Sequence, residues 1–281
     1  MSVWYHNDEP AAVAGIDDRA FQYGDGLFET VAIRSGEPRL WDLHIERLAA
    51  GCRTLGIEFP DPAGLRDKLM NAVHRSNENS AYCVAKIIIS SGISQRGYGR
   101  ASTQQGETYL GVFPARPLEL SSYERGVDTL LCGTRLAVGS PVAGLKTLNR
   151  LEQVLGRSEV LANGAFEGIM LDAEQRLICG TMSNVFIVSA QSVKTASLAR
   201  CGVEGIMRRF AIDTLRAEGL DVDVCDLSTD QFTASDEIFL TNSQFGLVPV
   251  RRCDDTHWHV GPVTRRCMEL LAERGVAECR V

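Results

Sequence analysis

One lysine constrains this chain more than any other feature, because it stands between a loop of small residues and an amphipathic segment. Residues 143–155 read AGLKTLNRLEQVL, and the lysine is Lys146. Apolar residues recur after it at the spacing of one helix face and predict a helix over 147–161: Leu148, Leu151, Val154 and Leu155. Apolar neighbours favour a neutral amine, because desolvation penalises the ammonium form, and a neutral amine can form a Schiff base with a carbonyl. Taken alone, Lys146 also fits a solvated lysine near a helix start.

Composition excludes several classes of protein. The 281 residues allow one large or two medium domains, and a formal charge of −7 argues against general nucleic-acid binding. No apolar run is long enough to span a bilayer, and the polar start over residues 1–10 does not resemble a signal peptide. Nine cysteines are scattered singly, without a C-x-x-C pair. We therefore expect reduced thiols in a cytoplasmic enzyme that binds neither membranes nor nucleic acids.

The pattern of elements predicts two domains of the α+β class. In the first part, strands are expected at 27–33, 82–90 and 108–113, and helices are expected after Asp42 and from Asp61-Pro62. Residues 114–122 (PARPLELSS) hold two prolines and no helical period, so the expected linker is 115–122. The domains are therefore expected at 1–114 and 123–281. In the second, a capping box at Ser228 and helices at 205–218 and 262–274 are predicted.

A second chemical signal lies at 202–205, where Gly-Val-Glu-Gly precedes the helix predicted from Ile206. The first backbone N–H groups of a helix have no partner within the helix, and the helix dipole adds partial positive charge there. Such a helix start binds anions, phosphate groups among them.

Three motifs in this order resemble the fold-type IV pyridoxal-phosphate enzymes: FQYGDGLFET at 21–30, AGLKTLNRLEQVL at 143–155 and GVEGIMRR at 202–209. That family includes branched-chain and D-amino-acid aminotransferases and 4-amino-4-deoxychorismate lyase. LKTLNRLEQVL and the RGYG at 96–99 are most similar to the lyase. The resemblance implies a smaller N-terminal α/β domain, a larger domain with a barrel-like mixed sheet, and a homodimer.

The resemblance also implies a role for individual residues. Lys146 corresponds to the lysine that forms the Schiff base with pyridoxal 5'-phosphate. The phosphate is assigned to the backbone of Ile206 and Met207, to Arg47 in HIERL, and to Ser243. Substrate contacts are assigned to Tyr23, Thr30, Arg96 and Tyr98, and Glu29 is a further candidate for proton transfer.

Two positions depart from the family pattern. The cofactor-binding position that usually holds a glutamate facing the pyridine nitrogen is Cys179, five residues before Asn184. A neutral thiol stabilises a pyridinium poorly, whereas a thiolate could partly replace the carboxylate. Ser91 stands where relatives often have an arginine.

The function implied is a lyase that converts 4-amino-4-deoxychorismate to 4-aminobenzoate and pyruvate by way of an external aldimine. An aminotransferase of the same fold, or a relative that binds cofactor without catalysis, remains an alternative. His257 and His259 alternate on one possible strand, but no third ligand accompanies them, so no metal site is expected.

Overall fold

The computed structural model describes residues 3–6, 9–11, 15–76, 78, 81–94, 97–100 and 106–280. The chain divides into two compact units. Unit 1 contains Met1–Arg116 together with the short segment Leu145–Asn149, and unit 2 contains Pro117–Gly144 and Arg150–Val281. Within the described part, no helix has the length and apolarity needed to cross a membrane.

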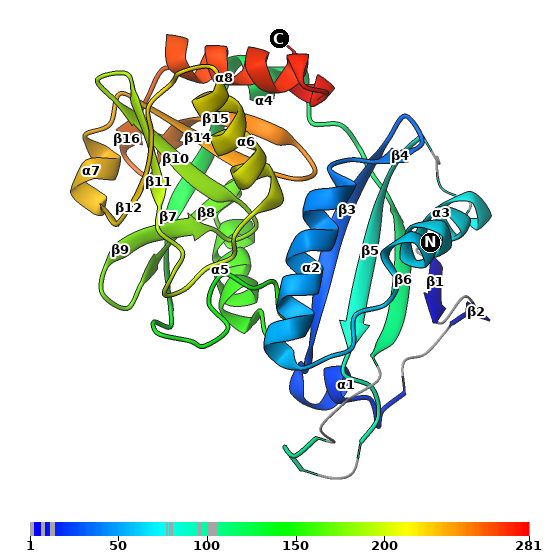
Figure 1. Cartoon of the computed structure of the whole chain (residues 1–281). Coiled ribbons are helices and arrows are strands. Elements are labelled where there is room, and N and C mark those ends of the chain that lie inside the picture. Colours follow the sequence, from blue (N-terminus) through cyan, green and yellow to red (C-terminus); the bar gives the residue numbers. More distant parts are fainter. Residues whose placement is uncertain are drawn as a thin grey trace. The chain divides into compact units, whose positions relative to one another are not determined.

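Unit 1 is an antiparallel sheet with helices packed on one face (Figure 1). The strand order is β2-β1-β6-β5-β3-β4. The strands are β1 (Val3–His6), β2 (Glu9–Pro10), β3 (Gly26–Arg34), β4 (Glu37–Pro38), β5 (Tyr82–Ser90) and β6 (Glu107–Pro114). The helices are α1 (Arg19–Tyr23), α2 (Trp41–Leu55) and α3 (Pro62–Arg75).

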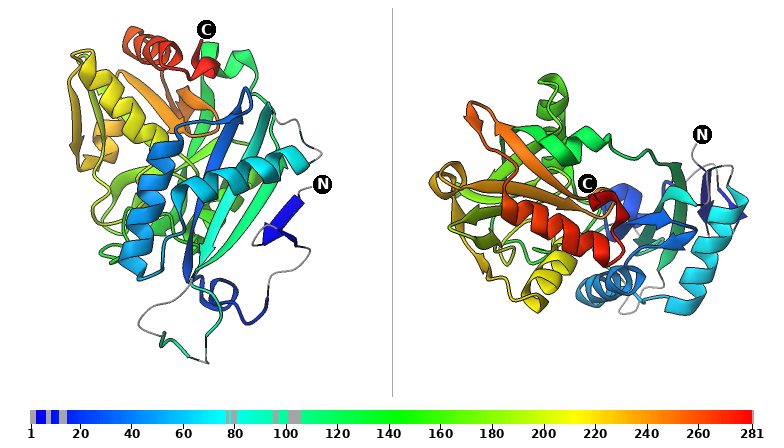
Figure 2. Two further views of the ribbon diagram at one scale, coloured as in Figure 1. Left: turned by 45° about the vertical axis from the view of Figure 1, so that its right-hand side comes forward. Right: turned by 90° about the horizontal axis from the view of Figure 1, so that it is seen from above.

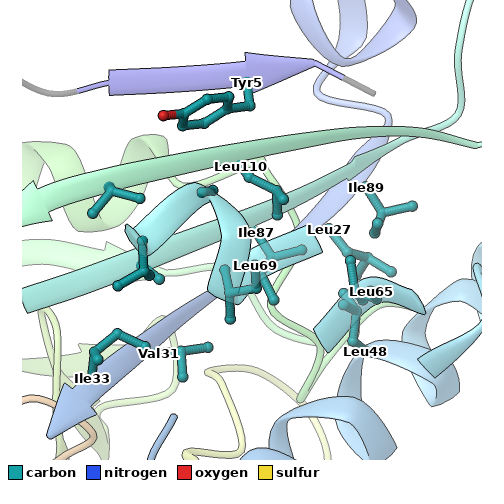
Figure 3. Packing of buried hydrophobic residues seen from close by; sticks show 14 of the residues in the cluster. Tyr5, Leu27, Val31, Ile33, Leu48, Leu65, Leu69, Ile87, Ile89 and Leu110 are labelled. Carbon is teal, nitrogen blue, oxygen red and sulfur yellow. The ribbon is translucent and has the colours of Figure 1, made fainter. Parts of the chain in front are cut away.

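The core of unit 1 lies between β3, β5 and the two long helices. Every second residue of β5 is buried, as expected for a strand with one face on the core. These side chains pack against Leu48 of α2 and Leu65 and Leu69 of α3 (Figure 3). Two local signals for the helices are confirmed: α2 ends at Gly56 in the left-handed conformation, and the Asp61 carboxylate accepts from Gly64 N at 2.7 Å. The expected start after Asp42 was wrong, because α2 begins at Trp41 with Leu40 as its N-cap residue, and Asp42 lies in its first turn.

Unit 2 is built on a mixed sheet of ten strands in the order β12-β11-β10-β14-β15-β7-β8-β9-β13, with β16 paired to β15 (Figures 1 and 2). β7 (Val127–Leu136) is parallel to β8 (Glu167–Asp172) and β15 (Gly246–Cys253), and β11 (Ser192–Ala196) is parallel to β12 (Val222–Cys225). The others are β9 (Arg176–Gly180), β10 (Asn184–Ser189), β13 (Leu227–Ser228), β14 (Glu237–Asn242) and β16 (Thr256–His257). Because β9 also lies against β10 and β11, the sheet curls almost to closure, which confirms the barrel-like architecture.

Helices surround this sheet: α4 (Leu120–Arg125), α5 (Leu151–Ala162), α6 (Ile206–Ala217), α7 (Thr229–Thr233), α8 (Pro262–Glu273) and the 3-10 turn Ala277–Cys279. The capping box predicted at Ser228 is present, because Ser228 Oγ accepts from Gln231 N at 3.1 Å and Gln231 Oε1 accepts from Ser228 N at 2.9 Å. α4 occupies part of the segment in which no helical period was recognised.

Candidate active site

Lys146 lies in an extended segment of unit 1 that pairs with the start of β3. The Lys146 carbonyl accepts from Phe28 N at 3.0 Å, and Leu148 N donates to the Gly26 carbonyl at 3.0 Å. Thr147 pairs with Leu27 as an antiparallel bridge. The backbone of the lysine is therefore held by a sheet-like contact on both sides.

The predicted start of the following helix was wrong. We expected a helix from residue 147, but α5 begins at Leu151. The reason is that residues 146–148 use their backbone groups to bond with β3, so the helix can begin only after them. The apolar stripe is also not buried as a core face would be: Leu151, Val154 and Leu155 are 78%, 57% and 57% exposed.

The Lys146 side chain is half-buried, and its Nζ lies 3.9 Å from the centroid of the Phe28 ring. An ammonium group over an aromatic face is stabilised by the ring quadrupole, and the apolar ring also removes water from the amine. Phe28 is therefore one apolar neighbour of the lysine amine.

Arg47 lies in a buried ionic cluster on the face of β3 opposite to the one that carries Phe28. Its Nε donates to Glu29 Oε1 at 2.7 Å and its Nη2 to Oε2 at 2.5 Å, while His44 Nδ1 lies 2.6 Å from Oε2. Burial alone would raise the pKa of Glu29, but the charges and hydrogen bonds of Arg47 and His44 outweigh it and lower this pKa to about 2. Burial lowers the pKa of His44, so His44 is neutral near pH 7.

Glu29 and Thr30 point to opposite faces of the sheet. Glu29 pairs with Ile87 and Thr30 with Lys86, and directly opposed residues of two antiparallel strands share a face. Glu29 is engaged with α2, which leaves it as the carboxylate of an ion pair rather than a proton relay. Thr30 is half-buried on the face that also carries Phe28.

Tyr23 and Tyr98 come together, although 75 positions separate them in the chain. Their ring centroids are 5.4 Å apart. Arg19 organises this region: it donates to Ser94 Oγ at 2.8 Å, to the Gly97 carbonyl at 2.9 Å and to the Tyr98 carbonyl at 3.1 Å. Tyr98 itself is 87% exposed. Arg96 lies outside the described residues.

In unit 2, the helix start that was expected to bind an anion is the start of α6. Gly205 is the N-cap residue, and as a glycine it has no side chain of its own with which to cap the helix. A Cβ on Gly205 would lie 2.0 Å from Asn184 Oδ1, so the Asn184 side chain, which donates to the Val203 carbonyl, would have to move. Ile206 and Met207, the two residues assigned to phosphate, are the first two of the helix and are buried.

Two other loops reach the same part of unit 2. Asn184 Nδ2 donates to the Val203 carbonyl at 3.0 Å, which ties the end of the 180–184 turn to the loop before α6. Asn242 Nδ2 donates to the Met182 carbonyl at 2.5 Å, so the loop that carries Ser243 lies against that turn. The structure thus brings together Ser243, the α6 start and the turn after Cys179, which are far apart in sequence.

Cys179 lies in β9 opposite Met170 and is 5% exposed. Burial raises the pKa of its thiol far above the usual range, and Glu167 adds to this effect while Arg150 opposes it. The thiol is therefore neutral, and a thiolate in place of the family's carboxylate is excluded at ordinary pH.

Sequence reasoning missed three residues that organise the site. Glu167 is fully buried and accepts from Thr181 N at 3.1 Å, Met182 N at 3.2 Å and Ser183 Oγ at 2.7 Å, which fixes the turn after Cys179. Arg19 holds the 94–99 loop, and His44 completes the Glu29 cluster. His44 stands three residues before Arg47, one helical turn away, which was an available signal. No comparable signal in the sequence pointed to Glu167 or Arg19.

The residues present fit two parts of pyridoxal phosphate, its phosphate group and its aldehyde. A helix start with a glycine N-cap, where an added Cβ would meet the Asn184 side chain, offers backbone donors to a phosphate. A half-buried lysine amine against an aromatic ring suits an aldehyde. The position expected to face the ring nitrogen holds Cys179, a neutral thiol that could share a hydrogen bond but cannot supply a negative charge.

Comparisons with known proteins find related enzymes over nearly the whole chain. Aminodeoxychorismate lyase of Vibrio harveyi is 33% identical over 268 residues, which cover 94% of this chain and 97% of that protein. The crystal structure of 4-amino-4-deoxychorismate lyase from Pseudomonas aeruginosa has a TM-score of 0.87 at 38% identity, over 97% of this chain and 99% of that one. Branched-chain amino acid aminotransferase of Escherichia coli, at 22% identity and a TM-score of 0.86 over 98% and 95% of the two chains, shares the fold. The family model for amino-transferase class IV matches residues 26–253, and the chain belongs to that family.

Proposed function

We propose that this chain is a pyridoxal-phosphate-dependent lyase that converts 4-amino-4-deoxychorismate to 4-aminobenzoate and pyruvate. The observation that carries the proposal is the likeness to two lyases over nearly the full length of all three chains, at 33% and 38% identity. D-alanine aminotransferase of Bacillus licheniformis is also similar, at 25% identity over 94% of this chain and 92% of that protein.

In this proposal Lys146 is the catalytic residue. Bound pyridoxal phosphate supplies an aldehyde for the substrate amine and a conjugated ring that withdraws electrons. The Lys146 Nζ first holds the cofactor and then, once released as a neutral amine, removes a proton from the substrate ring as general base. Loss of the enolpyruvyl group makes the ring aromatic, which drives the reaction forward.

The remaining residues bind and orient. Arg47, Ser243 and the N–H groups of Ile206 and Met207 are proposed to bind phosphate, and Cys179 to face the ring nitrogen. Tyr23, Thr30, Arg96 and Tyr98 are proposed to contact the substrate, with Arg19 fixing the loop that carries Tyr98.

Pyruvate release tests this function. The purified chain, loaded with pyridoxal phosphate, is given 4-amino-4-deoxychorismate without any 2-oxo acid. The proposal expects equal amounts of pyruvate and 4-aminobenzoate from the wild type and none from Lys146→Ala, with Lys68→Ala as a matched control that keeps activity. Turnover that appears only with an amino acid and a 2-oxo acid acceptor would identify an aminotransferase instead. Bound cofactor with no turnover in either assay would identify a non-catalytic relative.

We also propose a homodimer, with α5 as part of the interface. Leu151, Val154 and Leu155 lie within about one turn and are mostly exposed, and a stripe of large apolar side chains is typical of a protein interface. Leu155→Asp should shift the mass measured by light scattering from that of two chains to that of one. Val224→Asp, which places a charge on another exposed apolar residue, is the control. A single-chain mass for the wild type would overturn the proposal.

The thiols support a proposal for the compartment. All nine cysteines lie within the described residues, and none forms a disulfide. We propose a reducing, cytoplasmic location, since such thiols persist where glutathione and thioredoxin operate.

A further inference from the structure

Two of the chain's four lysines meet on one aromatic ring. Lys146 Nζ lies 3.9 Å from the Phe28 ring centroid, and Lys86 Nζ lies 4.8 Å from the same centroid. The remaining lysines are Lys68 and Lys194. The two amines are thus closer together than the Debye length, which is about 10 Å at 0.1 M salt, so each feels the charge of the other.

The strand register explains how Lys86 reaches this ring. Lys86 is opposite Thr30 in the β3–β5 ladder, and Ile88 is opposite Phe28, so Phe28 and Lys86 share the face of the sheet that is turned away from α2 and α3. Lys146 reaches that ring through its own pairing with β3. Backbone hydrogen bonds among β3, β5 and residues 146–148 therefore fix the positions from which Phe28 and the two lysines extend.

We propose that Lys86 is a positioning residue that keeps Lys146 in the neutral, nucleophilic form, and that Phe28 is the platform that holds the two amines together. A ring face stabilises an ammonium group, but a second ammonium on the same ring suffers repulsion from the first. While Lys86 carries its proton, protonation of Lys146 is disfavoured. A cationic neighbour is one of the known ways to activate a lysine nucleophile.

Glu29, Arg47 and His44 form one cluster in unit 1, and the charge of Lys146 acts on its His44 member. Glu29 and Arg47 carry opposite charges in direct contact, so their fields largely cancel at a distance. His44 is neutral near pH 7, because burial lowers its pKa. The Lys86 ammonium group is partly removed from water, and this burial lowers the pKa of Lys86. Less water means less screening between the two lysines.

The inference rests on the proposed function, since a neutral Lys146 matters only if this amine attacks a carbonyl. Its test does not use the cofactor, so the two can fail separately. The full chain, freed of any bound carbonyl compound, is treated with a trace of isotopically light acetic anhydride at a series of pH values. Denaturation, complete acetylation with the heavy reagent and proteolysis then give the reactivity of each of the four lysines, and hence its apparent pKa.

Lys86→Met should raise the apparent pKa of Lys146 by roughly 0.5–1.5 units, the size expected for loss of a unit charge at this range. Lys86→Arg keeps the charge and should leave Lys146 within about 0.3 units of the wild type. Lys68 and Lys194 should not change in either variant. Phe28→Leu, which removes the ring, should shift Lys146 in the opposite direction, because its ammonium form loses the aromatic face.

An unchanged Lys146 in Lys86→Met would overturn the inference. Equal shifts in Lys86→Met and Lys86→Arg would also overturn it, because they would indicate packing rather than charge. A second measurement gives an independent readout: the pH at which Lys146 reacts half-maximally with added pyridoxal, trapped by borohydride, should rise in Lys86→Met and not in Lys86→Arg. No such rise would contradict the proposed role even if the wild-type chain proves to be a lyase.

Discussion

Glu29 and Arg47 form a two-point ion pair within unit 1, with Nε–Oε1 at 2.7 Å and Nη2–Oε2 at 2.5 Å. The Glu29 side chain is 1% exposed and that of Arg47 is 13% exposed. This contact fixes the plane of the guanidinium group, because both oxygens of one carboxylate hold two of its nitrogens. An arginine that is to bind a phosphate in a set direction gains from such support.

Acid should weaken unit 1 through Glu29. Its pKa falls from 4.5 in the unfolded chain to about 2 in the folded one, so the ion pair contributes stability above pH 4.5 that is lost as the pH falls towards 2. Glu29→Gln should lower the free energy of unfolding by roughly 2–4 kcal/mol at pH 7, and by much less at pH 2.5.

Urea titration at the two pH values measures this difference. Glu37→Gln is the matched control, because Glu37 pairs with Arg66 at the surface, where both side chains are largely exposed. It should change stability by less than about 1 kcal/mol at either pH. Equal losses for Glu29→Gln at pH 7 and pH 2.5 would show that packing, rather than charge, stabilises the cluster.

Gly205 should be essential for phosphate binding. Its substitution by alanine brings a Cβ to 2.0 Å from Asn184 Oδ1, so the start of α6 or the Asn184 turn must move. We expect the affinity for pyridoxal phosphate to fall at least tenfold and that for pyridoxal, which lacks the phosphate, to change little. Gly15→Ala, with nothing within 4 Å of the added Cβ, is the control. A similar loss for both ligands would point to general unfolding of the site.

Cys179 should resist alkylation in the folded chain. Its thiol is buried, and burial raises its pKa, so little thiolate is present below pH 9. Iodoacetamide should label the half-buried Cys225 first, and all nine cysteines should react in denaturant. Labelling of Cys179 as fast as that of Cys225 in the folded chain would refute its assignment as an inert neutral thiol.

Arg19 should control the order of residues 97–100. Arg19→Met removes the donors to Ser94 Oγ and to the Gly97 and Tyr98 carbonyls. Hydrogen exchange of the amides of 97–100 should become faster, whereas Arg66→Met on α3 should leave them unchanged. Unaltered exchange in Arg19→Met would mean that other contacts order this loop.

Local chemistry made much of the fold predictable. The Asp61-Pro62 start of α3, the Gly56 end of α2 and the Ser228 capping box depend on neighbours within four residues, and all three are confirmed. The strand at 82–90 was found with its true limits, because a β-branched run is bounded there by polar residues. The family motifs added the barrel-like sheet, which no local pattern reveals.

Contacts between distant segments account for what was missed. The late start of α5 depends on the pairing of 146–148 with β3, about 120 residues away. Sequence alone favoured neither of two roles for Glu29, a strand residue or a proton relay, and it did not reveal the contact of Glu29 with Arg47 and His44. Glu167 lies 14 residues before the turn that it stabilises, without a motif to join them.

Reduction of the loaded chain with borohydride tests the central claim, that Lys146 is the amine that takes the cofactor. We predict a visible absorption band that borohydride abolishes, and a pyridoxyl adduct on the peptide that contains Lys146. Lys146→Ala should lack both, and Lys194→Ala should keep both. An adduct on Lys68, Lys86 or Lys194, or no band after pyridoxal phosphate is added, would contradict the account.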